Sequence, residues 1–382
     1  MFIQRRLASA LPRLMKGFPV VSLTGPRQSG KTTLLRNIFP DFQYVNLENL
    51  DWRALATDNP RGFINQFGGK TIIDEAQRVP ALFSYLQTHV DEVGQMGQYI
   101  LSGSQNFLLL EKITQSLAGR VGICRLLPFD KEELNPNGRL AAQTDEQLFK
   151  GFYPALYSRE VQPTDFYASY VASYIERDVR SITNVQNLNQ FRLFMRLCAG
   201  RIGQLINLNA LANECGISVP TAKAWLSILE SSYLAFSLPP YFRNFNKRLV
   251  KTSKLYFYDV GLVCYLLGIR EVGQIATHPL RGQLFENLVI AERQKEIFHL
   301  NSHQSLYFWR DNHGNEIDLL EEVNTQLRLT EIKSSMTFHP DFLRGIRFLE
   351  AAATSAIAER EVVYDGHITV MYQNTLLKNW RD

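Results

Sequence analysis

The sequence is poor in cysteine and has no long apolar run. Only four of its 382 residues are cysteine, and their spacing has neither the pairs of a zinc site nor the framework of a small secreted domain. We therefore expect reduced, buried thiols in a cytoplasmic protein at Cys124, Cys198, Cys215 and Cys264. No apolar run approaches the roughly 20 residues that a bilayer requires, so no membrane partner is expected.

No charge of one sign dominates either. There are 41 lysine and arginine residues against 37 aspartate and glutamate residues, for a net charge of +4, which neither requires nor excludes a polyanionic partner. The hydrophobic fraction of 45% and the charged fraction of 20% are ordinary for a globular protein. Because 382 residues exceed what one hydrophobic core usually supports, we expect two or three domains.

The first third of the chain alternates between short apolar runs and segments of helical periodicity. This alternation is typical of a parallel sheet covered by helices on both faces. The expected strands are residues 19–24, 44–47, 71–73, 99–101 and 121–127, and the expected helices are residues 31–38, 81–93 and 107–117. The sequence therefore predicts an α/β fold for this region.

A glycine-bounded loop follows the first expected strand and opens the first expected helix. It matches the pattern G-x-x-x-x-G-K-[ST], and with the next threonine its residues are Gly25, Pro26, Arg27, Gln28, Ser29, Gly30, Lys31, Thr32 and Thr33. The glycines let backbone N–H groups surround phosphates at a helix N-terminus. Lys31 is expected to reach the β- and γ-phosphates as a catalytic group, and Thr32 to offer its hydroxyl to Mg²⁺.

Two acidic residues end the third expected strand, which reads Thr-Ile-Ile-Asp-Glu. Asp74 is predicted to hold Mg²⁺, and Glu75 is predicted to be the general base that aligns and deprotonates the attacking water. Solvated acids at a strand end are the alternative, and the upstream loop argues against it. No guanine-reading N-K-x-D run follows, which favours ATP over GTP as the cofactor.

Polar residues after the next strand and a later arginine complete the predicted site. In Ser102-Gly103-Ser104-Gln105, Ser104 or Gln105 is the candidate for positioning the water or sensing the γ-phosphate. Arg120 is a candidate arginine finger, acting in cis or from a neighbouring subunit, that would stabilise the charge of the transition state. A surface arginine is the alternative.

Several segments resemble one known family. The segments GPRQSGKTTLL, IIDEAQ, ILSGSQ, LAGRV, LPFDKEEL, GFYPAL, YIERDV and GQLFENLVIAE resemble a family of bacterial and archaeal AAA-type ATPases fused to a C-terminal domain of unknown function. The resemblance implies an AAA-type module at residues 1–135 and a helical region at residues 136–272, with a winged helix at about residues 205–260. It also implies a C-terminal domain at residues 273–382 with a fold similar to that of restriction endonucleases. A fold does not by itself name a function.

The middle region contains two expected helices, residues 208–215 and 220–229, joined by a turn at Gly216. This spacing is typical of a helix-turn-helix, whose second helix contacts DNA in many proteins. The residues near its start are Ser218, Thr221, Lys223 and Trp225, and basic residues follow at Arg243, Lys247, Arg248, Lys251 and Lys254. A protein-packing module is the alternative, because a core pattern is present at Val219, Ala222 and Leu226.

The C-terminal region changes to a mixed pattern. Its expected elements are a helix at residues 283–298, strands at residues 306–310, 316–321 and 327–332, a helix at residues 340–353 and a closing strand at residues 361–364. Glu286, Asp318, Glu331 and Lys333 fit the D…(D/E)-x-K arrangement of endonuclease-like folds. The three carboxylates would bind Mg²⁺ while Lys333 orients the water. Cross-strand ion pairs in a domain used for binding are the alternative.

Three functions remain open from the sequence. The first is a motor or switch in which ATP hydrolysis drives a C-terminal domain that acts on DNA. The second is a nucleotide-regulated, metal-dependent nuclease. The third is a non-catalytic module in which ATP selects a conformation that binds a protein. DNA, a protein client and further copies of this chain are therefore the candidate partners.

Overall fold

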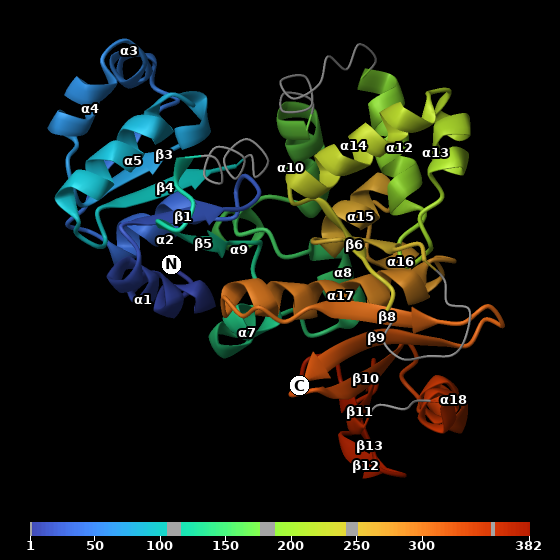
Figure 1. Ribbon diagram of the computed structural model, residues 1–382. Helices are drawn as coiled ribbons and strands as arrows, with labels where there is room; N and C mark the ends of the chain where they lie inside the picture. Colours follow the sequence, from blue (N-terminus) through green and yellow to red (C-terminus); the bar gives the residue numbers. More distant parts are fainter. Residues whose placement is uncertain (1, 105–115, 176–187, 242–250, 353–355) are drawn as a thin grey trace. The chain divides into compact units, whose positions relative to one another are not determined.

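The computed structural model describes residues 2–104, 116–175, 188–241, 251–352 and 356–382 (Figure 1). The chain divides into two compact units, which are described one at a time. The first comprises Met1–Asn137, Ser231–Leu234 and Lys295–Ser302, and the second comprises Gly138–Glu230, Ala235–Gln294 and His303–Asp382. The predicted domain boundaries near residues 135 and 272 stay predictions.

The first unit is built on a parallel sheet, drawn in blue to teal in Figure 1. Its strands are β1 (Val20–Thr24), β2 (Gln43–Asn46), β3 (Thr71–Asp74), β4 (Tyr99–Gly103) and β5 (Val121–Arg125). Within the described residues they lie in the order β2-β3-β4-β1-β5, and the neighbouring strands run parallel. The predicted α/β fold with a parallel sheet is confirmed.

Helices cover both faces of this sheet. The helical elements are η1 (Arg6–Ser9), α1 (Ala10–Gly17), α2 (Lys31–Ile38), α3 (Leu50–Asp58), α4 (Pro60–Gln66), η2 (Ala76–Arg78), α5 (Leu82–Val93), α7 (Lys131–Leu134) and η3 (Asn135–Asn137). Apolar side chains of α1 and α2 pack with Val21 and Leu23, whereas those of α3, α4 and α5 pack with Val20. Successive strand residues point to opposite faces, which explains this division. The expected helix at residues 107–117 lies almost wholly outside the described residues.

The carboxyl ends of β1, β3 and β4 meet at one edge of the sheet. Thr24 of β1 is in register with Gly103 of β4, and Asp74 of β3 is in register with Ser102 of β4. Ligands of open parallel sheets bind outside this edge. The register therefore brings the glycine loop, the two acids and the polar residues of β4 together from three distant parts of the sequence.

The middle part of the second unit is helical, with a core of aromatic rings. Its elements are α8 (Thr144–Lys150), α9 (Ala155–Ser158), α10 (Pro163–Tyr170), η4 (Val171–Ile175), α12 (Leu188–Ala199), α13 (Leu208–Cys215), α14 (Val219–Ser231), α15 (Val260–Leu266) and α16 (Gly273–Ala276). The Tyr153 ring lies 5.4 Å from that of Phe166 and 4.8 Å from that of Tyr170, between centroids. Such pairs add to the stability that burial alone provides.

The two expected helices of the helix-turn-helix are present as α13 and α14. The first ends at Cys215 and is followed by Gly216, which takes the left-handed conformation with φ of 64° that favours glycine after a helix. A two-stranded antiparallel sheet follows, made of β6 (Ala235–Leu238) and β7 (Lys254–Phe257). The residues 242–250 between these strands lie outside the described residues, and the winged helix stays a prediction.

The C-terminal part of the second unit carries a mixed sheet. Its strands are β8 (Leu306–Arg310), β9 (Glu316–Val323), β10 (Gln326–Lys333), β11 (Ile357–Tyr364), β12 (Val370–Tyr372) and β13 (Thr375–Asn379), and its helices are α17 (Arg281–His299), η5 (Pro340–Leu343) and α18 (Arg344–Ala352). Among the described residues the strand order is β12-β13-β11-β10-β9-β8. Ile346 and Leu349 of α18 pack into the core of this sheet. The likeness to restriction endonucleases stays a prediction.

The expectation that residues 361–364 form the closing strand is wrong, because β12 and β13 follow it. They pair through a two-residue turn in which Gln373 has φ of 45° and Asn374 has φ of 62°. Hairpin turns of this kind usually contain glycine, which is absent here. The three residues of β12 are also too few to show an alternating pattern, so the sequence gives little sign of this hairpin.

The four cysteines are buried and form no disulfide, as expected. Burial, together with the neighbouring Cys215, raises the pKa of the Cys198 thiol, which keeps that thiol in its unreactive protonated form. Among the described residues, no helix combines the length and the apolar character that crossing a membrane requires.

Candidate functional site

The glycine loop between β1 and α2 has a backbone that suits glycine at both ends. Gly25 has φ of +151° and Gly30 has φ of +92°, conformations that disfavour a side chain. A Cβ at Gly25 would lie 2.0 Å from the carbonyl oxygen of Leu126, which follows β5. The close approach of the neighbouring strand therefore requires glycine at this position.

Lys31 is the first residue of α2, and its side chain turns back into the loop. Its Nζ donates hydrogen bonds to the carbonyl oxygens of Gly25 at 2.8 Å and Pro26 at 2.9 Å. The buried hydroxyl of Ser29 has no hydrogen-bond partner among the described residues. A cation and an unsatisfied donor in one loop fit the binding of phosphate oxygens.

The other predicted nucleotide-binding residues differ in exposure. Arg27 is half-buried, with its guanidinium 3.9 Å from a carboxylate oxygen of Glu48. Gln28 and Thr33 are exposed, and Gln28 takes the left-handed conformation with φ of 58°. Both exposed residues therefore have their side chains at the surface of the loop.

Asp74, at the carboxyl end of β3, accepts hydrogen bonds from four donors. Thr32 Oγ1 and Tyr44 OH donate to Oδ2 at 2.8 and 2.7 Å, and the Glu75 backbone N–H donates to Oδ1 at 3.1 Å. The Ser102 hydroxyl also donates to Oδ1. All four donors are uncharged. Thr32 and Asp74 present adjoining oxygen atoms, which are the ligands that Mg²⁺ prefers.

Glu75 follows Asp74 in a left-handed backbone conformation with φ of 55°. Its Oε2 accepts hydrogen bonds from Gln77 Nε2 at 2.6 Å and from Ser104 Oγ at 3.3 Å. Burial raises the pKa of the Glu75 carboxyl, and the charge of Asp74 adds to this, against the opposing charges of Lys31 and Arg27. A carboxylate with a raised pKa is a stronger base than an exposed one.

Sequence reasoning missed Tyr44, Ser102 and Gln77 at this site. Tyr44 lies in the second expected strand, and nothing in that strand's pattern distinguishes it from a packing residue. Ser102 belongs to the polar run after β4 from which the sequence selected Ser104 and Gln105. Gln105 lies outside the described residues, whereas Ser104 contacts Glu75 as described above.

Arg120 lies at the opposite edge of the sheet. Its backbone carbonyl accepts a hydrogen bond from Val20, the first residue of β1, whereas the glycine loop follows the last residue of that strand. The length of β1 separates the two by roughly 15 Å. The guanidinium pairs with Asp91 of α5 at 2.5 Å. This position does not support a finger in cis, and action from a neighbouring subunit stays a prediction.

Three of the four predicted nuclease residues contact one another. Lys333 Nζ lies 3.2 Å from Asp318 Oδ2 and 2.6 Å from Glu331 Oε2. The backbone N–H of Ile332 donates to Asp318 Oδ2 at 2.8 Å. Glu286 is held instead by Lys254, whose Nζ lies 3.1 Å from Glu286 Oε1. The shared face of Glu331 and Lys333 is as expected from strand geometry.

The three carboxylates do not form a ligand set of three for a divalent metal. Among the described residues, one group of three has ligand atoms all within 4.8 Å of one another, and it contains none of Glu286, Asp318 and Glu331. Burial and the charge of Asp318 raise the pKa of Glu331 to about 8, against the opposing charge of Lys333. Ammonium groups, rather than open space, lie between the carboxylates. The residues therefore do not fit the Mg²⁺ that the family resemblance implies here.

The group of three within 4.8 Å consists of Asp130, Glu133 and His299. Arg5 Nε donates to Glu133 Oε2 at 2.9 Å, and the backbone N–H of Arg6 donates to Glu133 Oε1 at 2.8 Å. His299 Nδ1 lies 2.7 Å from Asp130 Oδ2. These contacts indicate that the three residues form a buried polar cluster that holds the N-terminal segment in place.

The predicted DNA-contacting residues are only partly at the surface. Ser218 and Lys223 are exposed, but Trp225 is buried and its ring lies 5.2 Å from that of Phe191. Lys254 is also buried, with 2% of its surface exposed. The expectation that Trp225 and Lys254 face DNA is therefore wrong. Arg243, Lys247 and Arg248 lie outside the described residues.

The expected core residues of α14 also differ. Ala222 and Leu226 are buried, as expected, whereas Val219 is 39% exposed. Val219 is the first residue of the helix, so its side chain lies beyond the packed turns. Direct DNA contact by this helix stays a prediction.

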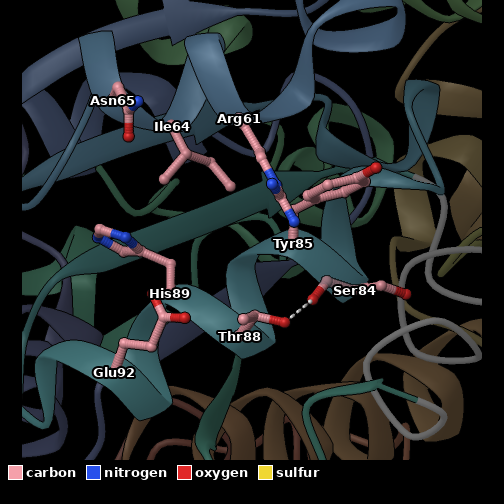
Figure 2. Close-up of a pocket in the computed structure, with 8 residues that line it drawn as sticks. All are labelled: Arg61, Ile64, Asn65, Ser84, Tyr85, Thr88, His89 and Glu92. Carbon is pink, nitrogen blue, oxygen red and sulfur yellow. Dashed lines mark hydrogen bonds between the residues drawn. The ribbon is translucent and has the colours of Figure 1, made fainter.

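A separate hollow of about 620 Å³ lies between α4 and α5 in the first unit. Figure 2 shows Arg61, Ile64 and Asn65 of α4 facing α5, which contributes His89 and Glu92 among others. The walls combine a guanidinium, an imidazole and a carboxylate. This mixture does not indicate one class of ligand, and no predicted site residue lines the hollow.

Family models match three segments of this chain. Residues 17–135 match the family model of an AAA domain. Residues 141–272 and 281–380 match two models described as domains of unknown function, DUF8612 and DUF4143. Two uncharacterized proteins, from Mycobacterium tuberculosis and Mycobacterium bovis, are each 30% identical over 371 residues, which cover 96% of this chain and 81% of the relative. The chain belongs to the family of these two proteins. The first domain of this family member is of the AAA type.

Solved structures of nucleotide-binding proteins are more distant from this family member. The Walker-type ATPase of Pyrococcus abyssi is 16% identical with a TM-score of 0.47, covering 69% of this chain and 96% of that one. DnaA of Aquifex aeolicus, solved with AMPPCP, is 14% identical with a TM-score of 0.30, covering 59% and 85% of the two chains.

Proposed function

We propose that this protein binds ATP in the glycine loop at residues 25–33 and hydrolyses it to ADP and phosphate. The observation that carries the proposal is the hydrogen bond of 2.8 Å between Thr32 Oγ1 and Asp74 Oδ2. It brings the hydroxyl at the start of α2 to the carboxylate at the end of β3, as a nucleotide-bound metal requires. Membership of the AAA-type domain family supports the same activity.

Different residues of the site bind the phosphates and the metal ion. When ATP binds, Lys31 exchanges its hydrogen bonds with the loop carbonyls for contacts with the β- and γ-phosphates and neutralises their charge. Backbone N–H groups of the loop hold the remaining phosphate oxygens. Thr32 and Asp74 would hold Mg²⁺, which neutralises phosphate charge when it is bound.

Glu75 has the role of general base. Its raised pKa favours proton abstraction from water at neutral pH. Gln77 and Ser104, which donate to its Oε2, keep the carboxylate in one orientation. Ser104 would move between this carboxylate and the γ-phosphate, which makes it the candidate sensor.

The test is Mg²⁺-dependent ATP turnover by the full chain, alone and with single-stranded, duplex or branched DNA. Lys31→Ala is expected to abolish turnover, and Glu75→Gln to retain nucleotide binding while slowing hydrolysis. Glu92→Gln, at an exposed carboxylate of α5, is the matched control and is expected to behave as the unmodified protein. Normal turnover in Glu75→Gln would show that another group is the base.

We propose further that the C-terminal region binds a partner in response to nucleotide, rather than cleaving nucleic acid. The supporting observation is the pairing of Lys333 with Asp318 and Glu331, which uses the charges that a metal would need. The nuclease alternative rests on the same observation, because Asp318, Glu331 and Lys333 lie in contact as the predicted site requires. It predicts Mg²⁺-dependent DNA cleavage that is lost in Lys333→Ala, and such cleavage would contradict our proposal. Cytoplasmic location and assembly into oligomers stay predictions.

A further inference from the structure

A buried ionic cluster joins the middle and C-terminal parts of the second unit. Its carboxylates belong to Glu286 on α17, Glu316 and Asp318 on β9, and Glu331 on β10. Its ammonium groups belong to Lys333 on β10 and to Lys254, the first residue of β7. The charge of Lys254 acts on Glu286, Glu316 and Asp318 together. The middle segment thus contributes a cation to a set of C-terminal carboxylates.

Lys254 is enclosed by its partners. Its Nζ lies 3.1 Å from Glu286 Oε1, contacts Glu316, and lies 5.5 Å from the centre of the Phe308 ring, while only 2% of the residue is exposed. Tyr256, two residues further along β7, donates its hydroxyl to the same Glu286 oxygen at 2.5 Å. A buried ammonium is costly unless it is paired and hydrogen-bonded. These contacts meet that condition.

Backbone covers the two ends of the cluster. A Cβ at Gly203 would lie 3.3 Å from Glu286 Oε2, and a Cβ at Gly345 would lie 2.0 Å from Glu331 Oε1. Mg²⁺ usually keeps several water molecules when carboxylates bind it. The close approach of Gly203 and Gly345 leaves little room for those waters beside Glu286 and Glu331.

We propose that Lys254 is the resident cation of this cluster. Its ammonium occupies the place between Glu286 and the carboxylates of β9 that a divalent metal would otherwise take, and it fastens β7 to α17 and β9. The cluster then binds no divalent metal while Lys254 is in place. This role does not depend on ATP hydrolysis in the first unit.

The pairing itself is tested by thermal unfolding of the full chain. Removing one partner of a buried pair leaves an uncompensated charge, so Lys254→Met is expected to lower the Tm by roughly 10 °C. Glu286→Gln removes the partner charge, and the double variant is expected to recover much of the loss. Lys251→Met, at an exposed lysine three residues earlier, is the control and should leave the Tm unchanged. Additive losses in the double variant would overturn the pairing.

Metal binding is tested separately, by electron paramagnetic resonance of Mn²⁺ with the full chain carrying Asp74→Asn, which removes the metal ligand of the first unit. No bound Mn²⁺ is expected at roughly 1 mM, the weak end of protein sites for divalent cations. One Mn²⁺ per chain that disappears on Asp318→Asn would overturn the proposal. This measurement keeps Lys254 and therefore decides the question even if Lys254→Met does not fold.

Discussion

The two groups of carboxylates in this protein face partners of different charge. At the edge of the first sheet, Asp74 accepts hydrogen bonds from Thr32, Tyr44, Ser102 and a backbone N–H, all of them neutral. In the C-terminal cluster the carboxylates contact the ammonium groups of lysines. Both groups contain the acids and the lysine of a metal-dependent site, and the sequence does not distinguish them.

The difference shows how to distinguish a carboxylate that is available to bind a cation from one that is already paired with a lysine. Neutral donors orient an oxygen and leave its charge for an incoming cation, whereas a buried ammonium cancels that charge. Hydroxyl donors can also turn away at little cost when a metal arrives. The charge of the partner is therefore more informative than the count of carboxylates.

The largest effect is expected from Asp74→Asn. An amide keeps the shape of the side chain but removes the charge that holds the metal, so ATP turnover should fall by roughly 10²- to 10³-fold. Asp58→Asn, at an exposed residue that ends α3, is the matched control. Turnover that stays within a factor of two in Asp74→Asn would remove the contrast between the two sites.

A smaller loss is expected from Tyr44→Phe. The phenol donates a hydrogen bond to Asp74 and lies outside the glycine loop, and such supporting groups typically contribute about 10-fold to metal affinity or activity. The Mg²⁺ concentration for half-maximal turnover should rise, while nucleotide binding without metal stays unchanged. Tyr85→Phe, at an exposed tyrosine of α5, is the control. An unchanged Mg²⁺ dependence would show that Tyr44 only packs against the strand.

The C-terminal cluster is expected to change the stability of the folded protein with pH, rather than ATP turnover. The pKa of Glu331 rises on folding from 4.5 to about 8, through burial and then the charge of Asp318. The native state therefore binds the extra proton between these values, and stability from this group falls as pH rises through them. The Tm of Glu331→Gln relative to the unmodified protein should increase by several degrees from pH 5 to pH 8. A constant difference would contradict the raised pKa.

The smallest effect is expected from Arg120→Ala. The arginine pairs with Asp91 at the edge remote from the glycine loop, so turnover of the dilute chain should stay within about two-fold, since exposed ion pairs contribute little. Turnover should be measured over a range of protein concentrations. A loss that appears only at high concentration would indicate that Arg120 acts on a neighbouring subunit.

Local motifs explain why the first site could be predicted in detail. The glycines of the loop, Lys31 and Thr32 are adjacent in the chain, and Asp74 and Glu75 end an apolar strand. Because parallel strands present their carboxyl ends at one edge, strand order alone was enough to bring these segments together. Whether Arg120 acts in cis or from a neighbouring subunit was left open, because the sequence does not say at which edge of the sheet a residue between two elements lies.

Lys254 shows the limit of the same reasoning. Along the chain it follows a run of basic residues and therefore resembles a surface contact for DNA. Its burial depends on β6 and β7 pairing and on α17 and β9 packing against that pair, which no local pattern encodes. Trp225 was misplaced for the same reason, because its partner Phe191 lies in another helix.

The sequence by itself determined the parallel α/β domain, the glycine loop and the acids that follow β3, since periodicity and adjacent residues carry that information. Only the tertiary structure decided which hydroxyls surround Asp74, where Arg120 lies, and that Lys254 enters the C-terminal cluster. The physical reason is that electrostatic partners act through space. Two lysines with the same sequence signal, Lys251 and Lys254, differ because one is exposed and the other is enclosed by carboxylates.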